Sequence, residues 1–328
     1  MTSLRRAATR CYAAARDPTT KYGGKSLEAA IRHCVALVKE NDDEFFKWAT
    51  YTMQKSKTNR APILVMKALQ LEIESIQFAA RTETLLRMRY QWWRDSIAKA
   101  FAATKSYEMA QPVMKACSEL VQSYPSMSQK RVQGMLDAYE MDAMRGETCF
   151  QRMDDLEGFA RDSTGALVAL QMEACGMGKD SVEAVAPSLG AGIGMTSALR
   201  RSLGLLSEYG ISYLPEDVCW RHGIDPGAFF DGKDKREALK GVARDIAVVA
   251  REHLDAANAA ARAVGGGTEG NERSERNERN EAKAFALQGL ASELWLQGLE
   301  KTGYDLLTTG GVSPVEYLLK LRWKSLQV

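Results

Sequence analysis

The chain contains 328 residues, and its 44 lysine and arginine residues nearly balance its 42 aspartate and glutamate residues, giving a formal net charge of +2. That balance argues against the concentrated basic surface of nucleic-acid-binding proteins, so no nucleic-acid partner is predicted. No apolar run reaches the roughly 18 residues that span a bilayer, which predicts a protein that is soluble or peripheral to a membrane. The six cysteines form no C-x-x-C pair, which predicts reduced thiols without a zinc or redox motif.

The first 25 residues form a basic segment that is almost free of acids. Its only acid is Asp17, and its cations stand among alanine, serine and threonine. An arginine-rich, acid-poor segment of this kind is typical of a mitochondrial transit peptide, and a disordered basic tail is the alternative. We predict import into mitochondria. The cations are Arg5, Arg6, Arg10, Arg16, Lys21 and Lys25.

Apolar residues recur at helical spacing along almost all of the remaining chain. Alternating strand patterns joined by hairpin turns are missing from the sequence, so the predicted class is all-α. Pro215 and Pro226, with glycines nearby, predict a break between two helices. The predicted helices are Leu27–Val38 (with Ser26 as N-cap), Ile63–Phe78, Thr84–Ala103, Pro112–Ser123, Ser128–Met144, Met153–Cys175, Val182–Leu206, Arg236–Val264, Ala282–Thr302 and Ser313–Leu326.

One stretch, residues 265–281, has low complexity. Three glycines lead into Asn-Glu-Arg repeats that offer almost nothing to bury. We predict a flexible charged insertion between two helices, and a charged docking segment is the alternative.

Several familiar motifs fail on inspection. Gly190, Gly192 and Gly194 follow no predicted strand, so they do not form a dinucleotide fingerprint and instead predict close helix packing. The three histidines stand far apart and lack metal-ligand spacing, and no Gly-x-Ser-x-Gly elbow occurs. Neither a metal site nor a cofactor site is predicted.

Six segments resemble the squalene/phytoene synthase family. Arg87–Ile97 (R-M-R-Y-Q-W-W-R-D-S-I) is similar to its R-x-x-x-W-W-R-[DE]-x-[IL] helix, with Trp92 and Trp93 as expected packing anchors. The other five segments are Asp155–Leu167, where Phe159 replaces a tyrosine, Thr196–Arg200 (T-S-A-L-R), Tyr213–Pro215 (Y-L-P), Arg244–Ala247 with the alanine-rich helix to Ala263, and Leu318–Lys324. The resemblance covers roughly residues 26–328 and implies a single-domain helical bundle around a central cavity.

Catalytic members of that family condense two prenyl diphosphates, and the resemblance implies that they use magnesium held by two D-x-x-x-D motifs. Aspartates four residues apart lie on one face of a helix and can share such ions. The first motif would fall near Ile73, Glu74 and Gln77, in a segment without aspartate. The nearby Glu72 and Glu74 are only two residues apart, so they point in different directions.

The second motif would read T-N-I-L-R-D-x-x-x-D. Here Ser197 stands at the asparagine, Arg201 at the first aspartate and Leu205 at the second. A cation repels magnesium and leucine supplies no oxygen ligand, so we predict a degenerate active site without catalytic residues.

A member of this family that carries a transit peptide but lacks the aspartates resembles its non-catalytic mitochondrial branch. That resemblance implies an assembly factor or accessory subunit of respiratory complex I, at the matrix or the matrix face of the inner membrane. It also leaves room for lipid in the cavity and for peripheral membrane association. One alternative is a lipid or prenyl-quinone carrier. The other is an active prenyl-diphosphate transferase with relocated ligands drawn from Glu72, Glu74, Asp154, Asp155 and Glu208.

Overall fold

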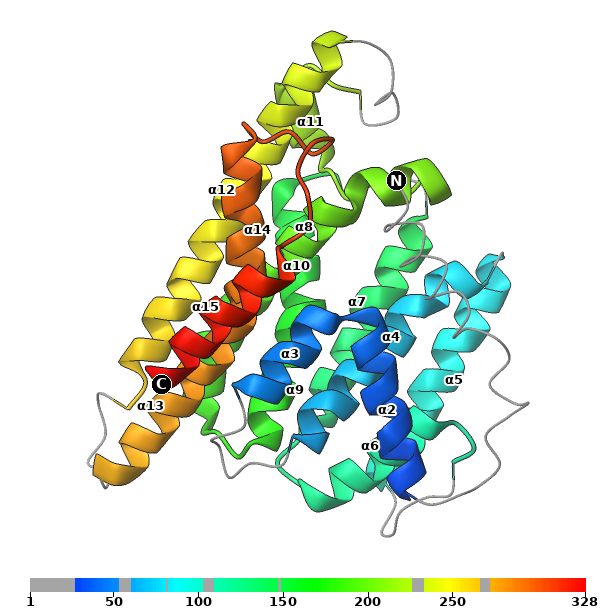
Figure 1. Cartoon of the computed structure of the whole chain (residues 1–328). Coiled ribbons are helices and arrows are strands. Elements are labelled where there is room, and N and C mark those ends of the chain that lie inside the picture. Colours follow the sequence, from blue (N-terminus) through cyan, green and yellow to red (C-terminus); the bar gives the residue numbers. More distant parts are fainter. Residues whose placement is uncertain are drawn as a thin grey trace. The chain divides into compact units, whose positions relative to one another are not determined.

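The computed structural model describes residues 27–52, 60–80, 82–102, 109–146, 149–225, 233–265 and 272–328. The predicted transit peptide lies outside these ranges. Every regular element within them is a helix (Figure 1), so the predicted all-α class is confirmed. Within the same ranges no helix is both long enough and apolar enough to cross a membrane. The central cavity stays a prediction.

The helices group into two compact units. The first unit holds the described residues up to Met144 together with Ala169–Lys179, and the second holds Arg145–Val168 and Asp180–Val328. The helices of the first unit are α2 (Leu27–Asn41), α3 (Asp43–Tyr51), α4 (Ala61–Ala79), α5 (Glu83–Ala102), α6 (Pro112–Ser123) and α7 (Gln129–Arg145), followed by the second half of α9 (Ala166–Ala174).

Helix α4 is the core of the first unit. Pro62 fills its first turn, where a missing N–H costs nothing, and every residue from Pro62 to Gln70 is buried. Helices α2, α3, α5 and α6 all pack against it. The Tyr90 hydroxyl then donates to the carbonyl of Tyr139 at 3.1 Å, which ties α5 to α7. The segment that resembles the first acidic motif therefore lies on a largely buried helix.

The second unit is built around two helices of 31 residues each, α10 (Lys179–Tyr209) and α12 (Lys233–Ala263). Its other elements are α8 (Met153–Ala160), the π-helix η1 (Arg161–Gly165), the first half of α9, α11 (Glu216–Arg221), α13 (Glu272–Ala286), the 3₁₀ turn η2 (Leu287–Gly289), α14 (Leu290–Lys301) and α15 (Pro314–Leu326). The predicted helix Met153–Cys175 thus contains a π-helical turn that the sequence pattern did not reveal.

The three glycines of the G-x-G-x-G run let α10 approach its neighbours closely. A Cβ at Gly190 would lie 2.1 Å from the Cα of Gly165 in η1. A Cβ at Gly194 would lie 2.7 Å from the Cβ of Ala160 in α8, and one at Gly192 would lie 2.7 Å from a side chain of α12. The predicted packing role of these glycines is confirmed, and they fix α10 between α12 and the α8–η1 segment.

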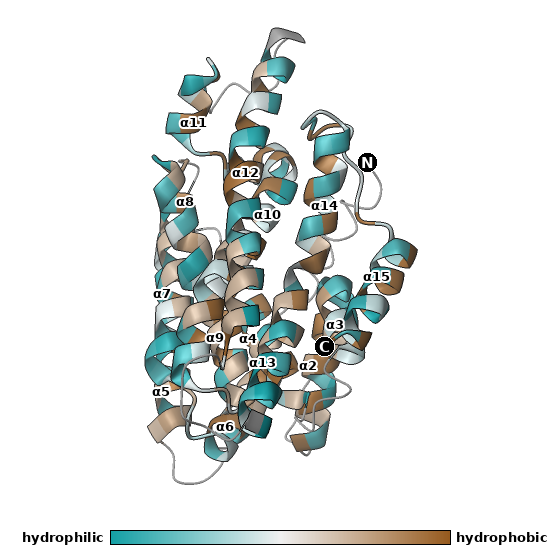
Figure 2. Cartoon of the chain, turned by 90° about the vertical axis from the view of Figure 1, so that its left-hand side faces the viewer, coloured by the Kyte–Doolittle hydropathy of each residue, from teal (hydrophilic) through white to brown (hydrophobic). Residues whose placement is uncertain are grey.

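The prediction of a flexible insertion throughout 265–281 is wrong, because α13 begins at Glu272. Arg279 donates to the carbonyls of Val264 and Gly265, which satisfies the exposed end of α12. The helix is strongly hydrophilic (teal in Figure 2), and its buried residues stand only near its end. They are Ala282, Ala284, Phe285 and Ala286. Residues 266–271 lie outside the described ranges.

Two short helices were not predicted. Helix α3 begins after Asp42, whose carboxylate accepts a hydrogen bond from the Phe45 N–H at 2.9 Å. Helix α11 begins directly after Pro215, which is the predicted break point. Neither helix fills the window of about 11 to 18 residues over which apolar periodicity identifies a helix, and only α3 has a side-chain cap to mark its start.

The glycine contacts predict a large difference between two alanine substitutions on α10. Gly190→Ala should lower the free energy of unfolding by at least about 2 kcal/mol, because its Cβ would overlap the η1 backbone. Gly204→Ala on the same helix meets nothing within 4 Å and should be neutral or stabilising by up to ~1 kcal/mol. Urea unfolding of both variants measures the difference. Equal stabilities would show that α10 can move away from η1 without loss.

Candidate functional site

Helix α10 carries the segment that resembles the second acidic motif. Ser197, Arg201 and Leu205 are spaced four residues apart, so they lie in one line along the helix. Ser197 and Arg201 are half-buried, and Leu205 is buried with 9% of its surface exposed. The line therefore presents a hydroxyl, a guanidinium and an aliphatic side chain in succession.

This set of groups does not fit a magnesium ion. Magnesium takes oxygen ligands in octahedral geometry, and a guanidinium is a permanent cation with donors only. Leu205 offers no ligand atom, and its burial shows that it has become part of the hydrophobic core of its unit. The adjacent Arg200 places its guanidinium carbon 5.8 Å from the ring centroid of Trp295 on α14. Arg201 thus places a cation at a position where the resemblance predicts a carboxylate.

Helix α4 carries the segment that resembles the first acidic motif. Ile73 is fully buried, whereas Glu74 and Gln77 are half-buried. The Glu74 carboxylate accepts a hydrogen bond from Gln70 Nε2 at 3.4 Å, and the same nitrogen lies 2.5 Å from the Tyr139 hydroxyl oxygen. Glu74 is therefore one member of a polar network inside the first unit. Its neighbour Ile73 extends the hydrophobic core.

Glu72 is the most perturbed carboxyl of this helix. Burial raises its pKa from 4.5 to about 7. Burial also raises the pKa of the Cys34 thiol, with the nearby Cys117 and Glu72 adding to the effect. Glu72 thus lies near Cys34 of α2, in a half-buried position. A carboxyl that prefers its neutral form is a poor ligand for a divalent cation.

The three other carboxylates considered for a relocated metal site lie in the second unit and are exposed. Asp155 accepts a hydrogen bond from the Arg152 N–H at 2.9 Å, and Asp154 pairs with the Arg152 guanidinium at 2.9 Å. Glu208 accepts from the Tyr209 hydroxyl at 3.1 Å. Among the described residues, no three histidine, cysteine, aspartate or glutamate side chains are grouped so that they could hold a metal ion.

An aromatic cluster surrounds the Tyr213-Leu-Pro segment of the second unit. The ring of Tyr213 lies 5.9 Å from that of Phe150 and 6.1 Å from that of Phe159, measured between centroids. The Arg145 guanidinium covers Phe150 at 4.2 Å and donates to the Ser212 carbonyl at 3.1 Å. Phe159 also contacts Phe150, with 5.7 Å between the ring centroids, so the three rings contact one another.

The sequence analysis missed Arg145 and Phe150. Their partner Tyr213 lies more than sixty positions further along the chain, and no local spacing links them. The interpretation of both tryptophans as packing anchors is also wrong for one of them. Trp93 is buried, but Trp92 is 45% exposed and meets the Trp93 ring edge-on at 5.1 Å. Of the two tryptophans, only Trp93 packs into the core of its unit.

Burial of Leu205 predicts that restoring an acid there damages the fold. Leu205→Asp should lower the free energy of unfolding by about 2–4 kcal/mol, because an unpaired carboxylate would replace a buried aliphatic group. Leu205→Met keeps the volume and should cost less than about 1.5 kcal/mol. Thermal and urea unfolding measure both variants. A Leu205→Asp protein as stable as the parent would show that this position still accommodates an acid.

The raised pKa of Glu72 predicts a pH-dependent stability difference. Between pH 4.5 and about 7 the unfolded chain releases a proton that the folded chain keeps, so the parent protein loses stability as pH rises. Glu72→Gln removes this loss and should be more stable than the parent at pH 8, on the order of 2 kcal/mol. At pH 5 the two should be nearly equal. Urea unfolding at both pH values is the measurement, and a constant difference contradicts the assignment.

Comparison with known proteins gives a consistent set of relatives. The protein named NADH dehydrogenase (ubiquinone) complex I, assembly factor 6, from Mus musculus is 21% identical over 295 residues, covering 89% of this chain and 80% of the relative. The protein of the same name from Bos taurus is 22% identical over 285 residues, covering 86% and 78%. The homologue from Dictyostelium discoideum is 24% identical over 193 residues, covering 58% and 52%.

Solved structures share the fold. A crystal structure of a dehydrosqualene synthase with bound ligand matches with a TM-score of 0.70 at 16% identity, covering 95% of this chain and 98% of that one. A squalene synthase from Alicyclobacillus acidocaldarius matches with a TM-score of 0.60 at 13% identity, covering 85% and 96%. The family model described as squalene/phytoene synthase matches residues 42–315. This chain therefore belongs to the squalene/phytoene synthase family.

Proposed function

We propose that this protein is a non-catalytic member of the squalene/phytoene synthase family that acts in mitochondria as an assembly factor for respiratory complex I. The observation that carries the proposal is the line of Ser197, Arg201 and Leu205 on α10, which offers a cation and a buried leucine in place of a carboxylate pair. The relatives from Mus musculus and Bos taurus are named complex I assembly factor 6, which supports the proposed role in complex I assembly.

We infer that catalysis is lost because the reaction must stabilise the negative charge of the departing diphosphate. Departure of diphosphate requires that several negative charges be neutralised by metal ions or fixed donors placed beforehand. In this chain the position of one aspartate is a guanidinium and the other is apolar, while the matching segment of α4 contains Ile73 and Gln77. One arginine can attract an anion, but it cannot organise a cluster of magnesium ions.

The proposed location follows from the function together with the basic segment of residues 1–25. That segment has the composition of a cleavable import signal for the matrix. An accessory subunit would remain with the finished complex, whereas an assembly factor would leave it. We assign the protein to the assembly factors because its relatives are named as assembly factors.

Depletion of the protein in its own cells tests the assembly role. Fully assembled complex I should fall severalfold on native gels, while the other respiratory complexes remain unchanged. Re-expression of the parent chain should restore complex I, and so should Arg201→Gln, because the proposal assigns Arg201 no catalytic step. Unchanged complex I after depletion would contradict the assembly role.

Purified protein tests the catalytic half independently. Incubation with magnesium and either farnesyl or geranylgeranyl diphosphate should release no more inorganic diphosphate than a heat-inactivated sample. Release that a chelator abolishes would establish a prenyl transferase instead. Stoichiometric lipid in an organic extract of the purified protein, without turnover, would favour the carrier alternative.

A further inference from the structure

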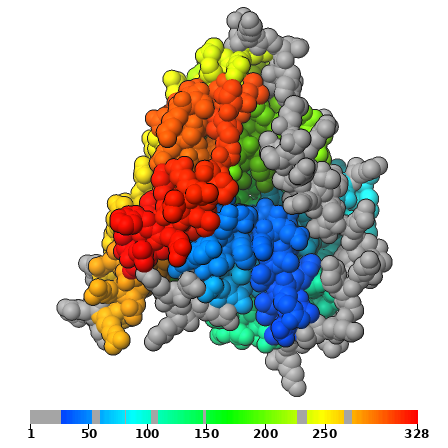
Figure 3. Space-filling view, viewed as in Figure 1, coloured from blue at the N-terminus to red at the C-terminus, as the bar shows by residue number. Residues whose placement is uncertain are grey.

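Helix α15 carries apolar residues on two opposite faces. Tyr317, Leu321 and Ser325 are buried against the rest of the second unit, where α15 packs on α14 and η2. The opposite face is exposed, as the space-filling view shows for the red segment (Figure 3). It consists of Val315, Leu319, Trp323 and Leu326, which are 67%, 66%, 67% and 70% exposed. We call these four residues the α15 stripe.

The α15 stripe is narrow and regular. Its members follow one another at intervals of four, four and three residues, so at about 100° per residue they fall within an arc of about 80°. The buried residues Tyr317, Leu321 and Ser325 lie on the other side of the helix axis. The helix thus has one apolar face used for folding and a second that the fold leaves in solvent.

The exposed face belongs to a helix whose two ends are held by specific contacts. The Ser313 hydroxyl caps the start of α15 and Pro314 fills its first position. Near its other end, Lys324 pairs with Glu293 of α14 at 3.1 Å. A helix held at both ends by specific contacts presents its exposed side chains as a fixed row.

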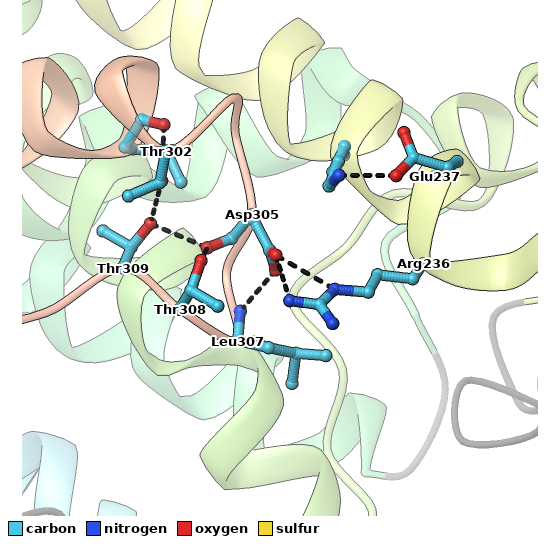
Figure 4. A network of polar contacts seen from close by, with 9 residues as sticks. Arg236, Glu237, Thr302, Asp305, Leu307, Thr308 and Thr309 are labelled. Atoms are coloured by element: carbon cyan, nitrogen blue, oxygen red, sulfur yellow. Dashed lines mark hydrogen bonds and ion pairs between the residues drawn. The ribbon is translucent and has the colours of Figure 1, made fainter. Parts of the chain in front are cut away.

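The loop that leads into α15 is anchored as well (Figure 4). The buried Asp305 carboxylate is paired with Arg236 of α12, and it accepts a hydrogen bond from the Leu307 N–H at 3.1 Å. Burial alone would raise the pKa of Asp305, but the hydrogen bonds from Arg236 and Leu307 outweigh it and lower the pKa. Asp305 is therefore an ionised anchor at neutral pH.

Cations follow the edges of the α15 stripe. Arg322 lies on one edge and is exposed. Glu316 lies on the other edge, and Lys320, which stands next to it further round the helix, pairs with it at 2.8 Å. Lys324 stands further from the stripe. The three cations and one acid of α15 leave it a net positive helix. Long basic side chains of this kind can reach upward from an apolar face toward phosphate groups.

We propose that α15 is a membrane-docking helix that lies in the headgroup region of a bilayer containing anionic lipid. The α15 stripe inserts at the boundary between headgroups and acyl chains, where tryptophan is favoured, and Lys320 and Arg322 contact lipid phosphates. The charge of the edges selects anionic over zwitterionic lipid. This inference goes beyond the assembly role and does not depend on it.

A bilayer fits this surface better than the groove of a protein does. The stripe has one aromatic residue of amphipathic character with aliphatic residues on both sides of it, and all four are exposed to a similar degree. The flanking charges have one predominant sign, which complements a surface of phosphates. A protein partner remains a distinct outcome that the experiment identifies.

The test uses the purified full-length chain and extruded vesicles, either phosphatidylcholine alone or phosphatidylcholine with cardiolipin. Flotation should recover the parent protein with the cardiolipin vesicles. Trp323→Glu should weaken this binding at least about tenfold, since it removes an inserted aromatic group. The double variant Lys320→Gln, Arg322→Gln should reduce the preference for cardiolipin by about fivefold for each cation removed.

The matched control is Trp220→Glu, because Trp220 on α11 is also 67% exposed and lies outside the α15 stripe. It should bind cardiolipin vesicles like the parent. Circular dichroism melting checks that all variants are folded, which the exposure of both tryptophans favours. Equal loss in both tryptophan variants, or a parent protein that does not float, overturns the proposal. Normal flotation of Trp323→Glu with failure to restore complex I in depleted cells also overturns it and indicates a protein partner.

Discussion

The close approach of α10 to η1 is the constraint on which the second unit depends. Gly190 meets the backbone of Gly165 with no room for a single methyl group, and Gly194 packs closely on the Cβ of Ala160 in α8. Backbone contact at this range leaves no freedom to slide or rotate the helix. Every residue further along α10, including Arg201 and Leu205, therefore takes the position that the glycines dictate.

In each unit, the segment that resembles an acidic motif contributes to packing. Carboxylates placed close together on one helix repel one another when no cation is present, whereas an aliphatic side chain at such a position adds hydrophobic burial. Leu205 adds a buried aliphatic group on α10, and Ile73 does the same on α4. Tyr213 keeps its aromatic neighbours although Phe159 has no hydroxyl. Each of the two segments thus contributes an aliphatic side chain to the core of its own unit.

The sequence predicted long helices well because burial and periodicity agree in them. Pro112–Ser123 matches α6 at both ends, since a proline starts the helix and no apolar residue continues it. Prediction failed where burial does not follow the apolar periodicity of the sequence. The charged repeats of α13 read as disorder, yet Arg279 caps α12 and Phe285 anchors the end of the helix. The contact of Arg145 with Tyr213 joins distant segments, and no local pattern contains that information.

Helix α15 shows a further limit of periodicity, because apolar residues surround most of it. A periodic pattern identifies the helix but does not say which of two apolar faces is buried. Burial of Tyr317 and Leu321 against α14 settles that question and leaves Trp323 and Leu319 in solvent. Exposed tryptophan and leucine on a firmly anchored helix cost solubility without adding stability, and a contiguous apolar row of this kind is typical of a surface that binds a partner.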